Sequence, residues 1–501
     1  MDKKIRSIHG WLLFGAVIAV VFMLGIACSI LLERRAEVKS VFNNRREKFN
    51  DEIIAQNERF KADFPLEYES WARTEDTSFR SRYNSSDATD ELKDRPEMVI
   101  LWAGYAFSKE YNTPRGHKHA LEDMRAILRT GNPGIDGEGD VQPATCWTCK
   151  GPDVPRMMRE LGLEKYYSGK WSDLGAEIVN PIGCSDCHDA RTMDLRPARP
   201  ALYEAWERRG LDVMAQSHQE MRSLVCAQCH TEYYFIKNPG GENNNYLMFP
   251  QDKGLTLEDA EAYYDEMGFY DYIHPLSKTP ILKAQHPCYE IAKQGIHGQR
   301  NVSCADCHMP YKSEGGIKYT DHHITSPLAY IDRTCQNCHR ESEETLRQNV
   351  FDRQKMCRDK RTQVEKALCA AHLEAKFAWE KGATEKEMKP ILDLIRKAQW
   401  RWDYGFASHG ASFHATDEVL RIFGDALDQA GEARRLTAKV LARHGYTDEV
   451  PMPDLSTKEK AQKYIGLDMP KLEDKNQRFL KEIVPQWLEK AKEEGKIIAC
   501  K

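Results

Sequence analysis

Features that would place this chain in several common protein classes are missing from its sequence. It has no excess of basic residues: 72 Lys and Arg stand against 77 Asp and Glu, so the net charge of −5 gives no indication of nucleic-acid binding. Alternating apolar and polar residues are rare between residues 146 and 339, so no large sheet is predicted there. Long uncharged apolar runs are confined to the amino end. With 41% hydrophobic residues, the chain can still build a core.

The amino end carries the one segment whose composition fits a membrane. Residues 10–32 are uncharged, close to the ~20 residues that a spanning helix needs. We therefore expect an uncleaved signal-anchor over residues 1–32, with a cleaved signal, a lipoprotein at Cys28 or a buried soluble helix as alternatives. Lys and Arg are more frequent after the segment than before it, which alone favours the opposite orientation. The sites described next require an exported body.

Cysteine, by contrast, is abundant. Ten of the 15 cysteines form five C-x-x-C pairs, and in four pairs a histidine follows at once. C-x-x-C-H is the attachment signature of c-type haem, in which two thiols bind one porphyrin and the histidine reaches its iron. The four predicted sites are Cys184, Cys187 and His188; Cys226, Cys229 and His230; Cys304, Cys307 and His308; and Cys335, Cys338 and His339.

Zinc and structural disulfides explain these pairs less well. Zinc ribbons join two C-x-x-C units about 15–20 residues apart, whereas 34, 38, 74 and 27 residues separate successive pairs here. Zinc also does not require a histidine directly after each second cysteine. A disulfide closed over two residues is redox-active rather than stabilising. We therefore predict at least four covalent haems, and burial against porphyrins would account for the irregular middle of the chain.

The fifth pair ends on a different residue. In "TCWTCK", Lys150 follows Cys146 and Cys149 where a histidine would be expected. A lysine amine binds iron only when it is deprotonated, against a free pKa of ~10.4, and both iron and burial favour deprotonation. A fifth haem with Lys150 as ligand is therefore chemically possible. A thioredoxin-like pair or a decayed haem site is the alternative.

The pattern around these pairs predicts four regions. After the anchor over 1–32, residues 33–62 are charged and helix-forming, like a stalk. Residues 63–341 hold the five pairs among short helices and loops, and residues 342–501 show the spacing of long helices. The predicted fold class is a mainly α multihaem cytochrome c, with an irregular haem-wrapping middle and an amino-terminal membrane anchor helix.

"CWTCK" followed by four C-x-x-C-H motifs resembles the pentahaem cytochrome c nitrite reductases, which form ammonia. The resemblance covers about residues 60–445. It implies five haems c, of which the Lys150 haem is catalytic and keeps one face open for nitrite. It also implies six-electron reduction of nitrite to ammonium, fed by four bis-histidine haems, and related reduction of hydroxylamine or sulfite. A pure electron carrier is the rival class, and it would not need C-x-x-C-K.

The resemblance assigns further residues around the catalytic haem. Arg129 in "AILRTGNP", Tyr233 in "CHTEYYF" and His286 in "LKAQHP" match the family's active-site residues. An all-oxygen set of the kind that a hard cation prefers would hold calcium: the Glu232 carboxylate, the backbone carbonyls of Tyr233 and Lys283, and the Gln285 amide oxygen. The alternative interpretation of Glu232 and Gln285 is that they are surface polar residues.

Four distal histidines are also implied, one for each haem of a C-x-x-C-H motif. By resemblance they are His117 for the pair 226/229, His297 for 335/338, His322 for 184/187 and His414 for 304/307. Three of them have close rivals in the sequence, namely His119, His323 and His409.

The remaining expectations concern partners and location. The resemblance implies a homodimer formed through the long helices and a membrane-bound multihaem cytochrome that passes on electrons from quinol. The body would be periplasmic, anchored to the inner membrane, or soluble if the amino-terminal signal is cleaved. Cys357 and Cys369 could form a disulfide in an exported protein or remain buried free thiols. The ending "KIIACK", with Cys500, supports no interpretation.

Overall fold

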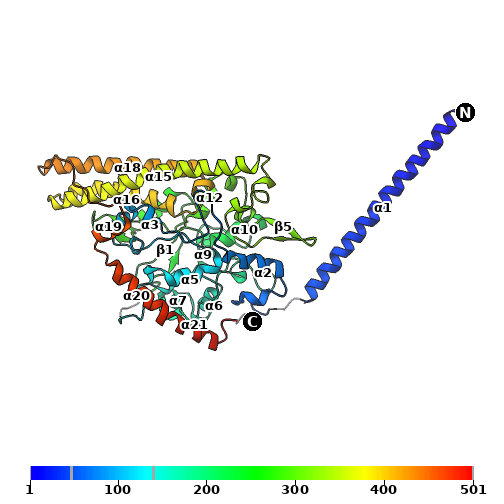
Figure 1. The fold of residues 1–501 in the computed structure, drawn as a ribbon, viewed down its shortest axis with the longest axis horizontal. Helices are drawn as coiled ribbons and strands as arrows, with labels where there is room; N and C mark the ends of the chain where they lie inside the picture. The colour runs from blue at the N-terminus through cyan, green and yellow to red at the C-terminus, as the bar shows by residue number, and fades with distance from the viewer. Residues whose placement is uncertain (1, 46–48, 138–141, 499–501) are drawn as a thin grey trace.

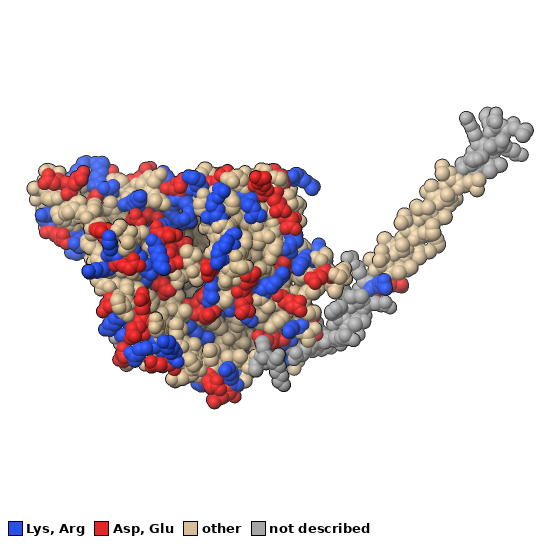
Figure 2. Space-filling view, viewed as in Figure 1, with Lys and Arg blue, Asp and Glu red and all other residues tan. Residues whose placement is uncertain are grey.

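A computed structural model describes residues 2–45, 49–137 and 142–498. Its first helix, α1 (Asp2–Arg45), projects away from the body (Figure 1). Within α1, residues Trp11–Arg34 have a mean hydropathy of 2.7 and none of this stretch is buried. Figure 2 shows this part of the helix almost free of charge, whereas Lys, Arg, Asp and Glu are interspersed over the visible face of the body. Among the described residues, no other helix is long and apolar enough to cross a membrane.

The packed body begins shortly after α1. Phe49, Ile54 and Phe60 are buried against one another and against Ala190, which lies beside the 184/187 pair. Residues 33–62 are therefore divided: the helix continues to Arg45, whereas the residues from Phe49 onward belong to the body. Cys500 lies outside the described residues.

Three long helices form one side of the molecule: α15 (Glu343–Glu380), α16 (Glu385–Ala407) and α18 (Thr416–Arg443) (Figure 1). Ser342 caps α15 by accepting the Thr345 N–H, and Thr384 and Glu387 form a capping box at the start of α16. Buried Ala, Ile, Leu, Met and Val side chains at helical spacing fill the space between the three helices. This region has its own apolar core, as the spacing predicted.

The middle of the chain is built from short elements that run between irregular segments. The α-helices are α2 (Pro65–Ala72), α3 (Glu91–Asp94), α4 (Glu97–Leu101), α5 (Ala120–Ala126), α6 (Asp153–Leu161), α7 (Leu163–Ser168), α8 (Cys184–Cys187), α9 (Pro200–Arg208), α10 (His218–Ala227), α11 (Leu257–Glu266), α12 (Cys288–Gln294), α13 (Ile296–Gln299), α14 (Cys304–His308) and α17 (Ala411–His414). The 3₁₀ turns are η1 (Asn57–Phe60), η2 (Arg73–Glu75), η3 (Ala106–Ser108), η4 (His117–His119), η5 (Leu128–Thr130), η6 (Ala144–Trp147), η7 (Ser172–Leu174), η8 (Pro327–Ala329) and η9 (Cys335–Asn337).

Strands are short and local. Antiparallel pairs join β1 (Tyr234–Phe235) to β2 (Leu247–Met248), β3 (Tyr272–Ile273) to β4 (Pro280–Ile281), and β5 (Tyr311–Glu314) to β6 (Ile317–Thr320). The fold is thus mainly α, as expected. The chain then crosses back over the body as α19 (Lys458–Tyr464), α20 (Met469–Glu482) and α21 (Val484–Glu493) (Figure 1).

The long helices also decide the state of two leftover cysteines. Cys357 and Cys369 are both free and buried, and both lie on α15. Twelve residues of helix separate them by about 18 Å, far beyond the reach of a disulfide. The buried free thiols are therefore the alternative that the structure supports.

Candidate functional site

A large cavity runs through the middle of the body. Its volume is ≈ 2450 Å³, against ~300–1,000 Å³ for ordinary small-molecule pockets. All ten cysteines of the five C-x-x-C pairs line it, together with Lys150 and the four motif histidines. Thiols and imidazoles around a space this large, with apolar walls, fit several covalently attached porphyrins.

In the pairs 184/187 and 304/307, one turn of α-helix carries both cysteines. In α8, the Asp186 carboxylate accepts the Gly183 N–H at 2.8 Å, and in α14 the Asp306 carboxylate accepts the Ser303 N–H at 2.8 Å. Both aspartates thus satisfy an amino-terminal N–H of the helix that carries the pair. Residues three apart lie on one face of a helical turn, so both thiols of a pair can face the cavity.

Neighbouring pairs adjoin one another. The Cys149 thiol contacts Cys229, and Cys226 contacts Cys304. The Cys187 Sγ lies 3.9 Å from the carbonyl oxygen of Val225. The 226/229 pair therefore lies at the centre, with the pairs 146/149, 184/187 and 304/307 around it.

Three pairs of imidazole rings that line the cavity share one separation, which His230 and His286 also have. Ring centroids lie 6.2 Å apart in His188–His322, His308–His414 and His297–His339. Two imidazole nitrogens that each lie about 2 Å from one metal ion put the ring centres about 6 Å apart. Each pair joins a motif histidine to the distal histidine that the resemblance assigned to it.

Hydrogen bonds at Nδ1 orient three of these rings. A ring whose Nδ1 donates to a backbone carbonyl leaves Nε2 free for a metal. Burial lowers the pKa of His188 and His414 to about 4, so these rings are held in the neutral form that binds metals. The Nδ1 bonds run from His188 to the Met193 carbonyl at 2.9 Å, from His308 to Thr325 at 3.0 Å and from His322 to Thr320 at 2.7 Å.

The rival histidines lie in different surroundings. His117 and His322 line the cavity, whereas His119 and His323 do not. Both ring nitrogens of His119 are hydrogen-bonded at 3.0 Å, one to a carboxylate and one to a backbone carbonyl. The arrangement therefore favours His117 over His119 and His322 over His323 as residues that can reach a bound group.

His409 lies in the predicted active-site region rather than beside His308. Its ring centroid is 5.3 Å from that of His286, and the ring planes are inclined by 36°. His286 also lies 6.2 Å from His230, on which His117 acts electrostatically as well. Burial lowers the pKa of His286 well below its usual value, and the neighbouring His409 and His230 lower it further. His286 is therefore a ring neighbour of His230, and His117 lies near enough to lower the pKa of His230 through its charge.

Lys150 ends the turn that carries the fifth pair. Its backbone N–H donates to the Trp147 carbonyl at 2.9 Å, and its side chain lines the cavity. Among the described residues, no carboxylate forms an ion pair with it. Lys150 is partly buried, and an ammonium held away from water without a counterion is unfavourable, whereas an amine bound to a metal is not. The position therefore fits a lysine that serves as a ligand.

Arg129 and Tyr233 line the same cavity. The Arg129 guanidinium carbon lies 4.2 Å from the ring centre of Phe107, and its Nε is buried without a hydrogen-bond partner among the described residues. Burial raises the pKa of Tyr233 well above its usual value, so the phenol keeps its proton. The Tyr105 hydroxyl approaches the Gln285 amide in the same region. A cation and two phenols thus lie near the Cys146–Lys150 segment.

Hydrogen bonds join three of the four predicted calcium ligands, and the fourth, Tyr233, directly follows Glu232 in the chain. Glu232 accepts the Gln285 N–H at 2.7 Å and the Tyr264 hydroxyl at 3.1 Å, and the Gln285 amide lies 3.1 Å from the Lys283 carbonyl. Burial raises the pKa of Glu232 well above its usual value, and the nearby Glu290 contributes. Such buried carboxylates are costly unless a cation accompanies them. Carboxylate, amide and carbonyl oxygens are the donor set for a hard divalent cation.

A buried ion pair supports this loop. Lys283 Nζ lies 2.8 Å from Asp403 Oδ1, and both side chains are fully buried. Asp271 accepts the Lys283 N–H at 2.8 Å. The Lys283 side chain therefore ties the segment 283–285 to α16, while its carbonyl remains directed to Gln285. Sequence reasoning assigned only that carbonyl.

Sequence reasoning missed three residues of this site. Tyr105, Phe107 and Asp271 reach it from segments without any local motif, so no signal in the sequence could have found them. His409 was recognised only as a rival haem ligand, and its place beside His286 depends on how α16 and α17 pack. Spacing identifies residues that act within one turn, whereas these four are brought together only by the tertiary fold.

Comparisons with known proteins agree with this arrangement. The family model for cytochrome c552 matches residues 56–496. A cytochrome c-552 of Porphyromonas gingivalis is 62% identical over 500 residues, covering 100% of this chain and 99% of its own, and one of Bacteroides thetaiotaomicron is 63% identical over 497 residues, covering 99% of each. Among solved structures, the catalytic subunit of cytochrome c nitrite reductase from Desulfovibrio desulfuricans, described with two calcium sites, matches with a TM-score of 0.73 and 30% identity, over 83% of this chain and 89% of that one. This chain therefore belongs to the cytochrome c552 family.

Proposed function

We propose that this protein reduces nitrite to ammonium, a six-electron reaction, at a c-type haem attached to Cys146 and Cys149 and ligated by Lys150. The observation that carries the proposal is the convergence of Lys150, Arg129, Tyr233 and His286 on one cavity that all five cysteine pairs line. A pure electron carrier would need neither the lysine nor this cluster. The structural similarity to a cytochrome c nitrite reductase supports the same conclusion.

Five haems are proposed, one for each cysteine pair. In four of them the iron would have two histidine ligands, which leave no position for substrate and suit the haem to electron transfer. The proposed pairs are His188 with His322, His308 with His414, His339 with His297, and His230 with His117. The 6.2 Å ring separations support the first three, and the position of His117 in the cavity supports the fourth.

When bound, the Lys150 haem would supply electrons and an open position for the nitrogen of nitrite. The chain's own residues would bind and orient the anion. The Arg129 guanidinium is a fixed cation with an unpaired N–H, suited to the nitrite oxygens. His286, whose lowered pKa keeps the resting ring neutral, would pass protons on by giving one from one ring nitrogen and taking one up at the other as the N–O bonds break. Tyr233 would keep its proton and act as a hydrogen-bond donor.

Calcium is proposed beside this haem, held by Glu232, Gln285 and the carbonyls of Tyr233 and Lys283. It would balance the buried Glu232 carboxylate and fix the loop that carries His286. Gln285 would then present its amide oxygen to the ion. In the structure the Gln285 amide nitrogen faces the Lys283 carbonyl. Exchanging the amide nitrogen and oxygen by a rotation of the side-chain amide would give the orientation that calcium needs.

The electron route and the location follow from the same arrangement. Electrons would come from a membrane multihaem cytochrome that oxidises quinol. The four histidine-ligated haems would supply electron transfer, and the 226/229 pair that would hold one of them adjoins the 146/149 pair. We propose a periplasmic body held to the inner membrane by residues 1–32 through the segment 33–62, and a homodimer that meets through the region 342–501. Hydroxylamine and sulfite would be further substrates of the same haem.

The test is an assay of the purified full-length protein with nitrite and a reduced artificial donor. We expect one ammonium for each nitrite and six electrons consumed. An electron paramagnetic resonance spectrum should show one high-spin haem among low-spin ones. Loss of ammonium formation in Arg129→Ala with all haems retained would support the site. A spectrum with low-spin haem only, together with no nitrite consumption, would assign the protein to the electron carriers instead.

A further inference from the structure

The carboxyl-terminal helices α20 and α21 lie against the part of the molecule that carries Lys150. Figure 1 shows them passing along α5, α6 and α7, far from α18, which precedes them in the chain. Neither the proposed reaction nor the sequence pattern gives residues 469–498 a task. Their contacts, however, converge on the segment Cys146–Asp153 and on the loop that holds Arg129.

An aromatic stack joins α21 to the C-x-x-C-K motif. Trp147, between the two thiols, lies flat on Trp171, with ring centroids 4.7 Å apart and planes inclined by 6°. Trp487 of α21 packs edge-on against Trp171, with ring centroids 5.5 Å apart and planes inclined by 65°, and Phe479 of α20 lies 6.0 Å from the same ring. Gly175 makes this approach possible, because a Cβ there would come within 2.3 Å of the Trp487 ring.

The Trp147 indole is fixed in a second way. Its Nε1 donates to the Trp171 carbonyl at 2.9 Å, and both side chains are fully buried. A rigid indole between Cys146 and Cys149 limits how the turn can rotate. Since Lys150 directly follows that turn, a shift of Trp171 would be transmitted to the lysine.

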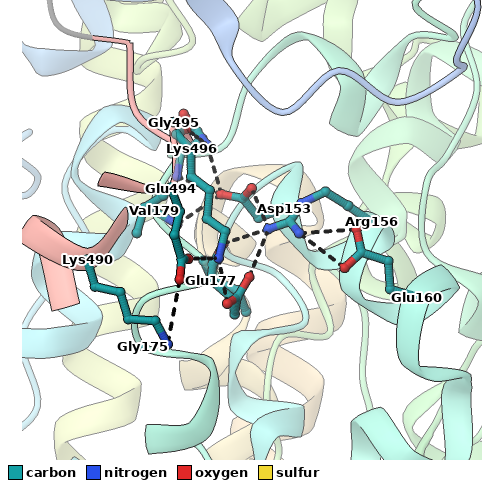
Figure 3. A network of polar contacts seen from close by, with 12 residues as sticks. Asp153, Arg156, Glu160, Gly175, Glu177, Val179, Lys490, Glu494, Gly495 and Lys496 are labelled. Carbon is teal, nitrogen blue, oxygen red and sulfur yellow. Dashed lines mark hydrogen bonds and ion pairs between the residues drawn. The ribbon is translucent and has the colours of Figure 1, made fainter. Parts of the chain in front are cut away.

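A polar network that includes Asp153, three residues after Lys150, reaches Lys496 near the end of the described chain (Figure 3). Asp153 accepts the N–H groups of Val179 and Asn180 at 2.9 and 2.8 Å. The Asn180 amide in turn donates to the Lys496 carbonyl at 3.2 Å, and the Lys496 ammonium lies 2.5 Å from Glu177. The tail thus holds the loop 177–180, which holds Asp153, three residues after Lys150.

The same segment supports the chain that leads to Arg129. Asn476 of α20 donates its amide N–H to the Ala126 carbonyl at 2.6 Å. Ile483, between α20 and α21, lies within 3.3 Å of the place where a Cβ on Gly134 would be. Arg129 lies between these two contacts in the sequence. Both the proposed haem ligand and the proposed nitrite-binding cation are therefore supported from α20–α21.

We propose that residues 469–498 form a clamp that sets the position of Lys150, and that Trp487 is its central positioning residue. This inference rests on the proposed role of Lys150 as the ligand of the catalytic haem. Trp487 touches neither the cavity nor a motif residue, and acts through Trp171 and Trp147. The clamp therefore affects the lysine-ligated haem and leaves the four histidine-ligated haems unchanged.

The test compares Trp487→Ala with a matched control, Gln486→Ala, in the full-length haem-loaded protein. Gln486 is the preceding residue and is exposed, and its amide N–H donates to the Glu482 carbonyl at the end of α20. The readouts are haem content per chain, the reduction potential and high-spin resonance of the Lys150 haem, and turnover with nitrite. We expect Trp487→Ala to keep five haems, to broaden and shift the high-spin signal, and to lower turnover about tenfold, as small misplacements of reacting groups do. Trp487→Phe should restore most of the high-spin signal and most of the turnover.

Several outcomes would overturn the clamp. An unchanged high-spin signal and unchanged turnover in Trp487→Ala would do so, as would equal shifts of the low-spin signals, which would indicate general loosening. If Trp487→Ala does not accumulate, Lys496→Ala is measured instead, since it removes the ion pair with Glu177 and keeps the backbone contact with Asn180. A smaller shift confined to the high-spin signal would support the clamp, and no shift would reject it. Failure of the proposed function itself would be visible in the unsubstituted protein, which would then lack a high-spin haem altogether.

Discussion

The segment 146–339 and the long helices 343–443 differ in what their apolar side chains pack against. In α15, α16 and α18, apolar side chains repeat at helical spacing and bury one another, so the core is made of protein. In the middle segment, short helices and turns surround a cavity of ≈ 2450 Å³, so much of what they bury against must be supplied by the haems. A periodic pattern thus identifies a region with an apolar cluster of its own, whereas its absence beside five cysteine pairs indicates a region that also packs against cofactors.

Haem removal should produce the largest difference in stability between the two regions. In a strain without the c-type haem attachment system, we expect the exported chain to lose the structure of residues 146–339, because their walls would enclose empty space or water. Limited proteolysis with mass mapping should then show cleavage throughout that segment, and slower cleavage within α15–α18. A haem-free middle that resists protease as well as the holoprotein does would contradict the account.

Exchange of Lys150 for histidine should have the next largest effect. Attachment depends on Cys146 and Cys149, so Lys150→His should retain five haems, while the axial ligand changes the electronic properties of the iron. We expect nitrite turnover to fall about tenfold, equivalent to ~1.4 kcal/mol in the barrier. Steady-state assay of the fully loaded variant is the measurement. Wild-type turnover would mean that any strong nitrogen ligand serves.

Loss of the calcium site should lower activity without loss of haem. Glu232→Ala removes the only carboxylate among the proposed ligands, so we expect less bound calcium and reduced turnover at full haem content. Glu207→Ala, exposed on α9, is the control. Metal analysis and nitrite assays on both variants test this. Full activity in a calcium-free preparation would exclude the role.

The affinity for calcium should also depend on pH, in one direction. Burial raises the pKa of Glu232, so the carboxyl keeps its proton to higher pH than an exposed one. Calcium needs the carboxylate and displaces that proton, so affinity should rise as pH rises through the shifted pKa and be lost below it. Calcium titrations of the chelator-treated protein at several pH values measure this. Equal affinity at all pH values would contradict the proposed role of Glu232.

A core substitution in the long helices should have the smallest effect on chemistry. Ile391 of α16 is fully buried between the helices. Ile391→Ala should cost about 2–5 kcal/mol of stability through the cavity that it leaves, while haem spectra and turnover per folded molecule stay unchanged. Thermal melts followed at far-ultraviolet and haem wavelengths check this, with the exposed Asp393→Ala as control. Altered haem spectra would show that the two regions are not independent.

The sequence predicted the parts of this molecule that are encoded within one turn or one helix. The motif residues Cys184, Cys187 and His188 needed only spacing, and α15 needed only periodicity. His322 and His323 are adjacent, and only the fold shows which one faces His188 at 6.2 Å. Spacing could not place these residues because their partners lie more than a hundred residues away.

Other features depend on tertiary packing alone. Tyr105 and the buried ion pair Lys283–Asp403 carry no motif, since contacts between distant segments create their environments. The packing of Trp487 on Trp171 likewise joins residues over 300 positions apart. A single sequence does not reveal such pairings, because neither residue type is unusual where it stands.

The central claim is that the pair before Lys150 is a haem site like the other four. Peptide mapping by mass spectrometry of the purified protein tests it directly, because c-type haem stays covalently attached to its peptide. The account predicts one haem on the peptide that contains Cys146 and Cys149, and five per chain in the intact mass. Unmodified thiols at Cys146 and Cys149, with four haems per chain, would contradict it.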